Sequence, residues 1–475
     1  MTSPTETDRP ESAPSETVRD PGSYRDPGGF IYRRNGVLYR QIDAASIDDW
    51  DAFVASGLAK RLIKAGRLIG HEPASLDEAA TPHARAVIRP DEIEFISYPF
   101  EWTFSELKDA ALLTLDVELE ALAAGWTLKD ASAYNVQFRD ARPILIDSLS
   151  FEVATPGAPW IAYRQFCEHF LAPLALMSMR DVRLGRLQRH YLDGIPLDLC
   201  SSLLPARTWL RVSALLHVHL HARAMRRYES ASVAKTTGTR QISTRALTGL
   251  STSLREAVNG LEWRPAGTEW ADYTSAHNYS DNAIEAKRSL VREYVAVAAP
   301  RTVWDLGGNT GTFSRVAREI APSVVCFDID PAAVELNYRE VRKRGETGLL
   351  PLQLDLMNPS PSLGWAHEER SSIESRGPVD LVMALALVHH LAIANNVPLA
   401  RVAESFSRLG RALIVEFVPK SDSQVERLLT NRADIFPDYT IEGFERAFEQ
   451  HWTVERTQRV GDSQRTLYLM RRRER

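Results

Sequence analysis

Hydrophobic and polar positions in the second half of the chain follow two alternating periods. Short apolar runs typical of buried strands are separated by stretches with the spacing of amphipathic helices. The strand-like runs are VWDL at 303–306, VVCFDID at 324–330, LLPLQLDL at 349–356, DLVMALAL at 380–387 and RALIVEFV at 411–418. This order predicts a parallel sheet covered by helices on both faces. Two later runs predict an antiparallel pair that completes the sheet, WTVERTQRV at 452–460 and RTLYLMRR at 465–472.

The first half has a mixed pattern. FIYRRNGVLYRQI at 30–42 predicts a hairpin, because Asn35 and Gly36 suit the positive φ angles of its turn. Helical periodicity then predicts helices at 47–58 and 107–124, a strand-like EIEFISYPF at 92–100 between them, and a mostly helical region at 159–227. The expected organisation is a disordered tail at 1–27, an α+β domain at 28–228, a Ser/Thr-rich linker with one short helix at 229–270, and an α/β domain at 271–475.

Composition narrows the class of protein. The 475 residues are 44% hydrophobic and 25% charged, which is enough to build sizeable cores. A formal net charge of -5 makes nucleic acid a poor expected partner. Three scattered cysteines without a CxxC pattern predict neither a disulfide scaffold nor a thiolate zinc site. The sequence shows no apolar leader and no apolar run near the ~20 residues of a bilayer span, so we expect a cytoplasmic protein without a transmembrane segment.

The turn after the first strand of the α/β domain carries the strongest functional signal. In VWDLGGNTGTFS, glycines lie between a strand and a helix, where a Cβ would keep the backbone from approaching a ligand. The dinucleotide pattern G-x-G-x-x-G fails, because its third and sixth positions are not glycine. The segment resembles motif I of class I S-adenosylmethionine-dependent methyltransferases, acidic-x-Gly-x-Gly-x-Gly. Asp305, Gly307 and Gly311 match this motif, Gly308 lies between them, and Asn309 replaces the middle glycine.

The resemblance continues through the following strand ends and covers about residues 271–470. It implies S-adenosylmethionine as the cofactor, with Asp328 accepting the ribose hydroxyls and Asp355 near the adenine amine. Leu356 or Met357 would pack on the adenine ring, and Ala384 would lie beside the methionine end. The expected cofactor residues are Asp305, Gly307, Gly308, Asn309, Gly311, Asp328, Asp355, Leu356 and Ala384.

His389 and His390 follow the fourth strand, where the family places the sulfonium and the methyl acceptor. Either imidazole is a candidate acceptor contact or general base, because histidine takes up a proton near neutral pH. The alternative for both is a solvated or capping position at the start of a helix.

Segments that flank the predicted sheet add weaker candidates. The stretch before the first strand would form a lid in several methyltransferase families, and a long insertion follows the fifth strand at 419–440. Ordinary packing remains the alternative for each residue. The candidates are Tyr273, Asn278 and Tyr279 in the first stretch, and Glu416 and Asp434 in or beside the second.

The first half contains a second resemblance. In LKDASAYNVQF and PILIDSLSFE, the spacing of Asp130, Asn135 and Asp147 resembles the catalytic loop and the metal-binding Asp of protein-kinase-like and aminoglycoside-phosphotransferase-like enzymes. In those enzymes the first Asp orients a hydroxyl, and the Asn and second Asp hold Mg²⁺ on the nucleotide. A Gly-rich loop and a strand lysine are missing, since Lys60 and Lys64 lie in a helical pattern. Three interpretations stay open: ordinary turn residues, a kinase-like fold without activity, and an active phosphotransferase that uses Mg-ATP.

His217 and His221 could share a helical face, but no third ligand accompanies them, so no metal site is expected. The predicted fold class is α/β, with a Rossmann-like seven-stranded methyltransferase sheet in the C-terminal domain and an α+β N-terminal domain that resembles kinase-like enzymes. The leading hypothesis is a methyltransferase for a small-molecule or glycan-type acceptor. The alternatives are a bifunctional methyltransferase-phosphotransferase and a non-catalytic nucleoside-binding protein.

Overall fold

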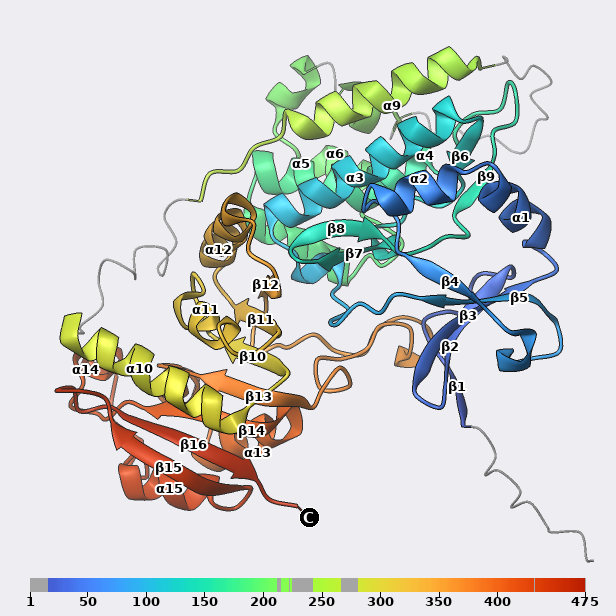
Figure 1. Cartoon of the computed structure of the whole chain (residues 1–475). Coiled ribbons are helices and arrows are strands. Elements are labelled where there is room, and N and C mark those ends of the chain that lie inside the picture. The colour runs from blue at the N-terminus through green and yellow to red at the C-terminus, as the bar shows by residue number, and fades with distance from the viewer. Residues whose placement is uncertain are drawn as a thin grey trace, which may run out of the picture.

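The computed structural model describes residues 16–211, 215–221, 223, 242–265, 281–430 and 432–474. We call residues 16–265 the N-terminal domain and residues 281–474 the C-terminal domain. Figure 1 shows the C-terminal domain beside the N-terminal domain, with the helix-rich part of the N-terminal domain above its antiparallel sheet. No helix within the described ranges is long and apolar enough to cross a bilayer.

The C-terminal domain is built on one seven-stranded sheet in the order β12-β11-β10-β13-β14-β16-β15. Strands β10 to β14 are parallel, and β16 runs antiparallel to both of its neighbours. The strands are β10 (Thr302–Leu306), β11 (Ser323–Asp328), β12 (Leu349–Gln353), β13 (Val379–Ala384), β14 (Gly410–Phe417), β15 (Trp452–Arg459) and β16 (Thr466–Arg472). The strand positions and the final antiparallel pair predicted from sequence are confirmed.

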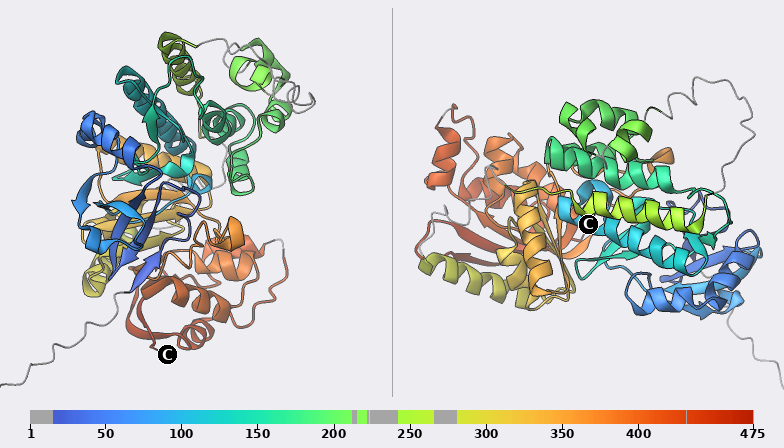
Figure 2. Two further views of the ribbon diagram at one scale, coloured as in Figure 1. Left: turned by 90° about the vertical axis from the view of Figure 1, so that its right-hand side faces the viewer. Right: turned by 90° about the horizontal axis from the view of Figure 1, so that it is seen from above.

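Helices cover both faces of this sheet. Helix α10 packs on α11 and β14, whereas α13 packs on α15 and β14 from the other side, as the view from above shows (Figure 2). The helices are α10 (Asp281–Ala298), α11 (Thr312–Arg318), α12 (Pro331–Arg344), α13 (Leu399–Leu409), α14 (Ser423–Leu429) and α15 (Ile441–Phe448), with shorter turns η8 (Trp365–His367) and η9 (His390–Ala394). Buried apolar side chains on both faces explain why the central strands read as continuous apolar runs.

The N-terminal domain begins with an antiparallel sheet in the order β1-β2-β3-β5-β4. A helical part follows, together with two small strand pairs, β6 with β9 and β7 with β8. The strands are β1 (Thr17–Arg19), β2 (Gly29–Arg34), β3 (Val37–Asp43), β4 (His71–Ala74), β5 (Ala84–Pro90), β6 (Trp126–Leu128), β7 (Val136–Arg139), β8 (Arg142–Leu145) and β9 (Phe151–Val153). The predicted β2–β3 hairpin is confirmed, with φ angles of 51° at Asn35 and 81° at Gly36.

The predicted helices of this domain are also found. The α-helices are α1 (Ile47–Ala55), α2 (Leu58–Lys64), α3 (Phe104–Ala123), α4 (Tyr163–Phe166), α5 (Ala172–Met179), α6 (Leu197–Leu203) and α9 (Thr244–Asn259). Shorter helical turns are η1 (Leu76–Glu78), η2 (Pro99–Glu101), η3 (Ala133–Asn135), η4 (Cys167–Leu171), η5 (Val182–Arg189), η6 (Ala206–Leu210) and η7 (Leu215–Leu220).

Three expectations need correction. The predicted strand at 92–100 is wrong: the strand ends earlier, as β5 at Pro90, and the segment after it is apolar because it packs against the other domain. There Phe95 makes edge-to-face contacts with Trp304 and Phe327, with ring centroids 5.7 and 5.8 Å apart. Within the segment interpreted as a linker, α9 is a 16-residue helix that packs along α3. Residues 16–27, assigned to a disordered tail, include β1, which pairs with β2.

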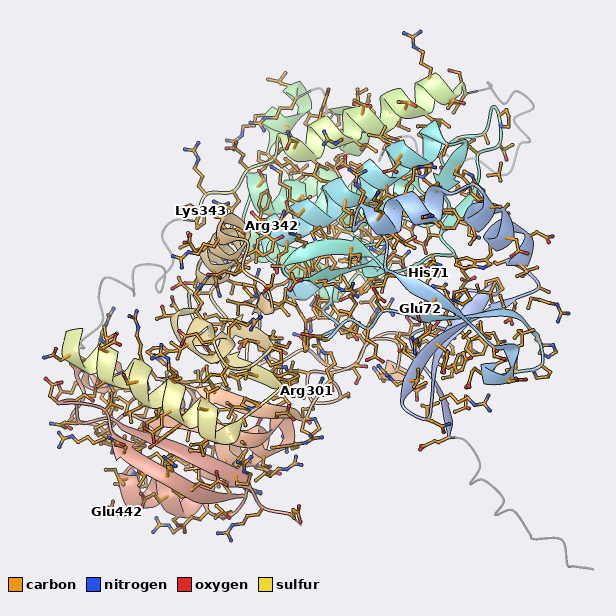
Figure 3. The ribbon with its side chains drawn as sticks, in the orientation of Figure 1. His71, Glu72, Arg301, Arg342, Lys343 and Glu442 are labelled. Carbon is orange, nitrogen blue, oxygen red and sulfur yellow. The ribbon has the colours of Figure 1, made fainter. Side chains whose placement is uncertain are left out.

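The two domains share a polar boundary along α3 and α12. The Tyr338 hydroxyl donates to Asp109 Oδ2 at 2.8 Å, and Arg342 Nε lies 3.5 Å from the same oxygen. Arg342 is labelled beside α12 in Figure 3. Because both Tyr338 and Arg342 belong to α12, the helix that follows β11 is held directly by the N-terminal domain.

Candidate active site

The turn between β10 and α11 uses left-handed backbone angles. Gly307, Asn309 and Gly311 have φ values of 73°, 51° and 81°. Glycine adopts this region freely, and asparagine tolerates it better than most residues. Asn309 therefore keeps a turn that a β-branched or bulky residue would strain.

Gly308 lies where no side chain fits. A Cβ there would be 2.5 Å from Cys326 Sγ and 2.8 Å from Asp305 Oδ2. Asp305 is buried and accepts a hydrogen bond from Ser314 Oγ at 2.6 Å. Burial raises the pKa of Asp305 to about 6. The backbone of the β10–α11 turn thus packs directly against the buried carboxyl group of Asp305.

Asp328 ends β11 and is tied to the same turn. Its Oδ2 accepts from the backbone N–H of Asn309 at 2.8 Å, and its Oδ1 accepts from the N–H of Asp330 at 2.9 Å. Burial raises the pKa of Asp328 to about 6. Asp330 itself caps α12 by accepting from the N–H of Ala332. The carboxyl group of Asp328 is therefore fixed beside the carboxyl edge of the sheet.

Asp355 lies in the turn that follows β12. The chain reaches it through Leu354, whose N–H donates to the carbonyl of Asp328 at 2.9 Å. Asp355 Oδ1 accepts from the N–H of Met357 at 2.9 Å, and Leu356 between them is half-buried. The structure thus brings Asp328 and the 355–357 turn to neighbouring strand ends, as expected.

The residues that follow β13 pack against the β10–α11 turn. Ala384 is fully buried, and Ala386 has a φ of 51°. The Cβ position at Gly307 lies 3.2 Å from Leu387 Cδ1, so Leu387 packs against the glycine. These residues place the β13 end directly beside the β10–α11 turn.

His389 and His390 lie next to each other after β13, with ring centroids 4.1 Å apart. His389 is 1% exposed, and neither of its ring nitrogens has a hydrogen-bond partner. Burial lowers the pKa of His389 well below its usual value and that of His390 to about 4. Both imidazoles are therefore uncharged at neutral pH.

A buried ion pair beside this region was not predicted. Lys287 Nζ of α10 lies 2.6 Å from Glu416 Oε2 of β14, and both residues are almost fully buried. The ammonium also lies 4.6 Å from the ring centroid of Phe313 in the first turn of α11. Sequence reasoning singled out Glu416 but not Lys287. The available signal was a lysine on the apolar face of a predicted helix in a chain that has few lysines.

The weaker candidates divide into two groups. Asp434 forms an exposed ion pair with Lys420 at 2.6 Å, apart from the buried Glu416. Tyr273, Asn278 and Tyr279 lie outside the described residues.

His217, one of the two histidines that could share a helical face, makes ordinary hydrogen bonds. His217 lies 2.9 Å from the Tyr163 hydroxyl and 3.0 Å from that of Ser253.

The structure also brings together Asp130, Asn135 and Asp147. Asn135 Nδ2 donates to Ser150 Oγ at 3.3 Å, and Ser150 Oγ donates to Asp147 Oδ2 at 2.5 Å. Arg40 of β3 forms a 2.6 Å ion pair with Asp147. Burial would raise the pKa of Asp147, but Arg40 and the hydrogen bonds hold it below its usual value. Burial and the nearby Asp147 raise the pKa of Asp130.

A segment of the C-terminal domain lies against this part of the N-terminal domain. The connection between β12 and β13 places Glu369 against Tyr24 and Arg25, with 2.8 Å between Arg25 Nη2 and Glu369 Oε1. Arg370 stacks on the ring of Tyr134, 4.1 Å from its centroid. The C-terminal domain thus contacts both the β1–β2 loop and the loop that carries Asp130 and Asn135.

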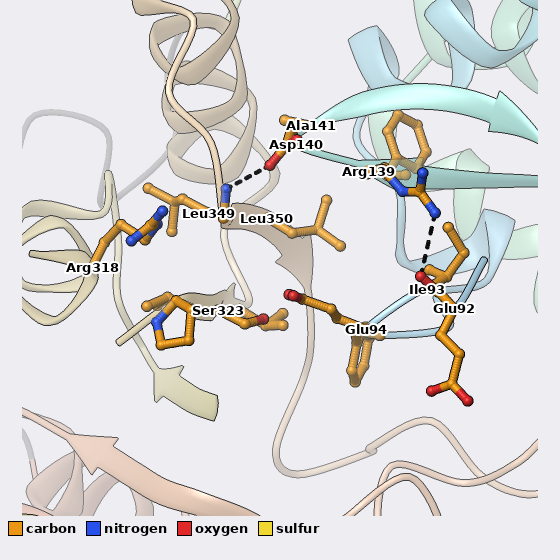
Figure 4. A pocket seen from close by; sticks show the side chains of 16 residues that line it. Glu92, Ile93, Glu94, Arg139, Asp140, Ala141, Arg318, Ser323, Leu349 and Leu350 are labelled. Atoms are coloured by element: carbon orange, nitrogen blue, oxygen red, sulfur yellow. Dashed lines mark hydrogen bonds between the residues drawn. The ribbon is translucent and has the colours of Figure 1, made fainter. Parts of the chain in front are cut away.

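A separate cavity of about 270 Å³ lies between the domains (Figure 4). Its walls include Ser323 and Leu349 at the amino ends of β11 and β12, and Glu94 and Arg139 from the N-terminal domain. The residues expected to bind the cofactor lie at the carboxyl ends of these strands. The cavity is therefore at the opposite edge of the sheet from the candidate site.

The strand order and the site together define the class. A parallel sheet with an antiparallel strand inserted beside its last parallel member, and a glycine turn joined to an acidic residue at the next strand end, form a class I methyltransferase domain. The C-terminal domain therefore has a methyltransferase-like fold.

Comparison with known proteins adds the family. The chain is 37% identical over 464 residues to the nodulation protein NoeA of Rhizobium meliloti (strain 1021), covering 95% of this chain and 96% of that protein. It belongs to the family of this protein. No family model matches the chain.

Solved methyltransferases are also similar in part. N-methyltransferase NodS from Bradyrhizobium japonicum WM9 is 10% identical with a TM-score of 0.29, over 41% of this chain and 99% of that chain. Magnesium protoporphyrin IX methyltransferase (ChlM) from Synechocystis PCC 6803, with bound SAH, is 16% identical with a TM-score of 0.29, over 43% of this chain and 93% of that one.

Proposed function

We propose that this protein transfers a methyl group from S-adenosylmethionine to a small-molecule or glycan-type acceptor. The observation that carries the proposal is the link between Asp328 and the N–H of Asn309, which joins the ribose-side carboxylate to the glycine turn. In folds of this kind, a carboxylate at this strand end accepts the hydroxyls of a nucleoside ribose.

The other predicted cofactor residues fit the same orientation. Asp355 and Leu356 follow the strand next to Asp328 and would border the adenine. Ala384 ends β13 across from the turn and would border the methionine end. The bound cofactor supplies a methyl group already activated by its sulfonium. The protein then has to hold the acceptor atom in line with the carbon–sulfur bond.

His389 and His390 remain the proposed acceptor-side residues. Because their pKa values are lowered by burial, both are neutral at pH 7 and can accept a hydrogen bond from a hydroxyl or amine. Such a contact would orient the acceptor, and when the acceptor is a hydroxyl its proton would pass to the contacting imidazole nitrogen as the new oxygen–carbon bond forms.

The family relationship suggests where the reaction belongs. A relative that matches nearly the whole chain is a nodulation protein. We infer that the acceptor is an intermediate of a biosynthetic route used in nodulation. The net charge of -5 favours an acceptor that is not a polyanion.

Labelled-methyl transfer tests this function. Purified protein, S-adenosylmethionine with a labelled methyl group, and size-fractionated metabolites and oligosaccharides should give one labelled product. The Asp328→Ala variant should lose the label. Asp380→Ala is the matched control, since Asp380 accepts backbone N–H groups of Arg301 and Thr302 at the opposite edge of the sheet. Cofactor binding without transfer to any fraction would favour the non-catalytic alternative.

For the N-terminal domain we propose a kinase-like fold that does not transfer phosphate. An antiparallel sheet precedes a helical part, and Asp130 and Asn135 precede a hairpin that ends before Asp147. Kinases hold nucleotide phosphates with a lysine on their third strand, whereas Arg40 of β3 is paired directly with Asp147 here. Arg370 of the other domain stacks on Tyr134 of the loop between Asp130 and Asn135.

The phosphotransferase alternative can be tested on the full chain. We expect Mg-ATP to leave the thermal midpoint unchanged, because a ligand raises it only by binding the folded state. A rise in the midpoint that disappears in Asp147→Ala would contradict the proposal and support a bifunctional enzyme.

A further inference from the structure

The segment that follows β12 is held by hydrogen bonds from the N-terminal domain. It carries Asp355 and the rest of the expected adenine-side turn, yet residues 354–364 form no helix or strand. At its start, Gln353 Nε2 donates to the carbonyl of Trp102 at 3.0 Å. The chain therefore leaves the sheet already attached to the other domain.

Arg189 holds the middle of this segment. From the end of η5, its guanidinium donates to the Asn358 carbonyl at 3.1 Å, to Asn358 Oδ1 at 3.2 Å and to the Pro359 carbonyl at 2.9 Å. Burial lowers the pKa of Arg189, and the nearby Asp355 carboxylate opposes that effect. One side chain of the N-terminal domain thus fixes the backbone immediately after the 355–357 turn.

Glu101 holds the two ends of the same connection. It is 1% exposed and accepts from Ser360 Oγ at 2.5 Å. It also accepts from Arg376 Nη1 at 2.9 Å and Nη2 at 2.5 Å. Charge-assisted, bidentate bonds of this kind are among the stronger hydrogen bonds in proteins. Ser360 lies near the start of the connection and Arg376 just before β13. Glu101 therefore joins the two ends of the loop through hydrogen bonds.

We propose that Arg189 and Glu101 are positioning residues for the adenine side of the cofactor site, acting through the 355–357 turn. This inference rests on the proposed function. A loop without regular structure must be ordered before it can contact a ligand, and that ordering opposes binding. By fixing the loop in advance, the N-terminal domain raises the affinity of the C-terminal domain for its cofactor. The accessory half of the chain is then part of the cofactor site.

The test compares Arg189→Ala with Arg186→Ala in the full chain. Arg186 lies on the exposed side of the same short helix and serves as the matched control. Calorimetric titration should show a roughly tenfold rise in the Kd for S-adenosylmethionine in Arg189→Ala and no change in Arg186→Ala. Adenosine alone should lose the same factor, which places the effect at the nucleoside end. Hydrogen exchange at residues 354–360 should accelerate in the same variant.

If Arg189→Ala folds poorly, Glu101→Gln tests the same loop, because it removes the negative charge that binds Ser360 and Arg376. Unchanged Kd values in folded Arg189→Ala and Glu101→Gln overturn the positioning role. An equal loss of affinity in Arg186→Ala also overturns it, because the effect would then not depend on the loop. Failure of the parent protein to bind the cofactor would instead reject the proposed function.

Discussion

Glu335 of the C-terminal domain accepts a hydrogen bond from the backbone N–H of Ser105 in the N-terminal domain at 3.0 Å. The hydroxyls of Ser105 and Thr103 donate to the same carboxylate. A carboxylate at this position satisfies N–H groups that have no partner within helix α3 and interacts favourably with the helix dipole. The helix that follows Asp328 in one domain therefore caps the longest helix of the other.

Removal of this cap should loosen the first turn of α3. In Glu335→Ala, the N–H of Ser105 loses a charged acceptor, which is worth about 1.5–3 kcal/mol for a hydrogen bond of this type. Hydrogen exchange at residues 104–107 should accelerate by roughly tenfold or more. Glu340→Ala is the control, because Glu340 pairs with Arg344 on the exposed side of the same helix. Equal exchange rates in the two variants would contradict the capping role.

Cofactor affinity should depend on pH through Asp328. Its pKa is raised to about 6 by burial, so its carboxylate predominates above pH 6 and its neutral acid below. Because the ribose hydroxyls need an ionised acceptor, the Kd for S-adenosylmethionine should rise roughly tenfold between pH 7.5 and pH 5. Titrations in Asp328→Asn should show weak binding with a much smaller pH dependence. A parent Kd that stays flat across this range would count against Asp328 as the ribose ligand.

Gly308→Ala should damage the cofactor turn. The added Cβ would lie 2.5 Å from Cys326 Sγ and 2.8 Å from Asp305 Oδ2, so the turn must move. We expect loss of cofactor binding by calorimetry and a lower thermal midpoint. In contrast, Gly249 lies within α9 with no atom near its Cβ position, and Gly249→Ala should stabilise the protein by about 0.5–1 kcal/mol. Normal cofactor affinity in Gly308→Ala would show that the turn is not the binding site.

The buried Lys287–Glu416 pair should respond differently to single and double substitution. Glu416→Gln leaves the Lys287 ammonium buried without its carboxylate, which typically costs about 3–5 kcal/mol. Replacing both residues, as Lys287→Met with Glu416→Leu, should recover most of that loss because neither charge of the pair remains. Thermal unfolding of the three proteins measures this order. A single variant as stable as the parent would mean that the pair contributes little to folding.

The C-terminal fold could be predicted because the patterns that specify it lie within short stretches of sequence. Each central strand is a continuous apolar run, and the β10–α11 turn and Asp328 are short motifs at fixed spacing. The N-terminal sheet was less accessible, since β4 has only four residues and none of them is fully buried, and two arginines interrupt the apolar residues of β5. The apolar segment around Phe95 was mistaken for a strand because its partners, Trp304 and Phe327, are more than two hundred residues away in the chain.

Contacts between residues that are far apart in the sequence also limit prediction of the site. Residues that belong to sequence motifs, such as Asp305 and Asp355, could be named in advance as candidates. Arg189 and Glu101 could not, because nothing in their own sequence neighbourhood indicates a partner in the other domain. Lys287 was missed for the same reason, since its carboxylate partner lies on β14. Only the folded arrangement shows that the N-terminal half of the chain contacts the loop after β12.

The most direct test of the central claim is calorimetric titration of the full chain with S-adenosylmethionine, alongside Asp328→Ala and the control Asp380→Ala. We predict one binding site with a micromolar Kd in the parent and in Asp380→Ala, and loss of binding in Asp328→Ala. No binding in the parent, or the same Kd in the parent and Asp328→Ala, would contradict it.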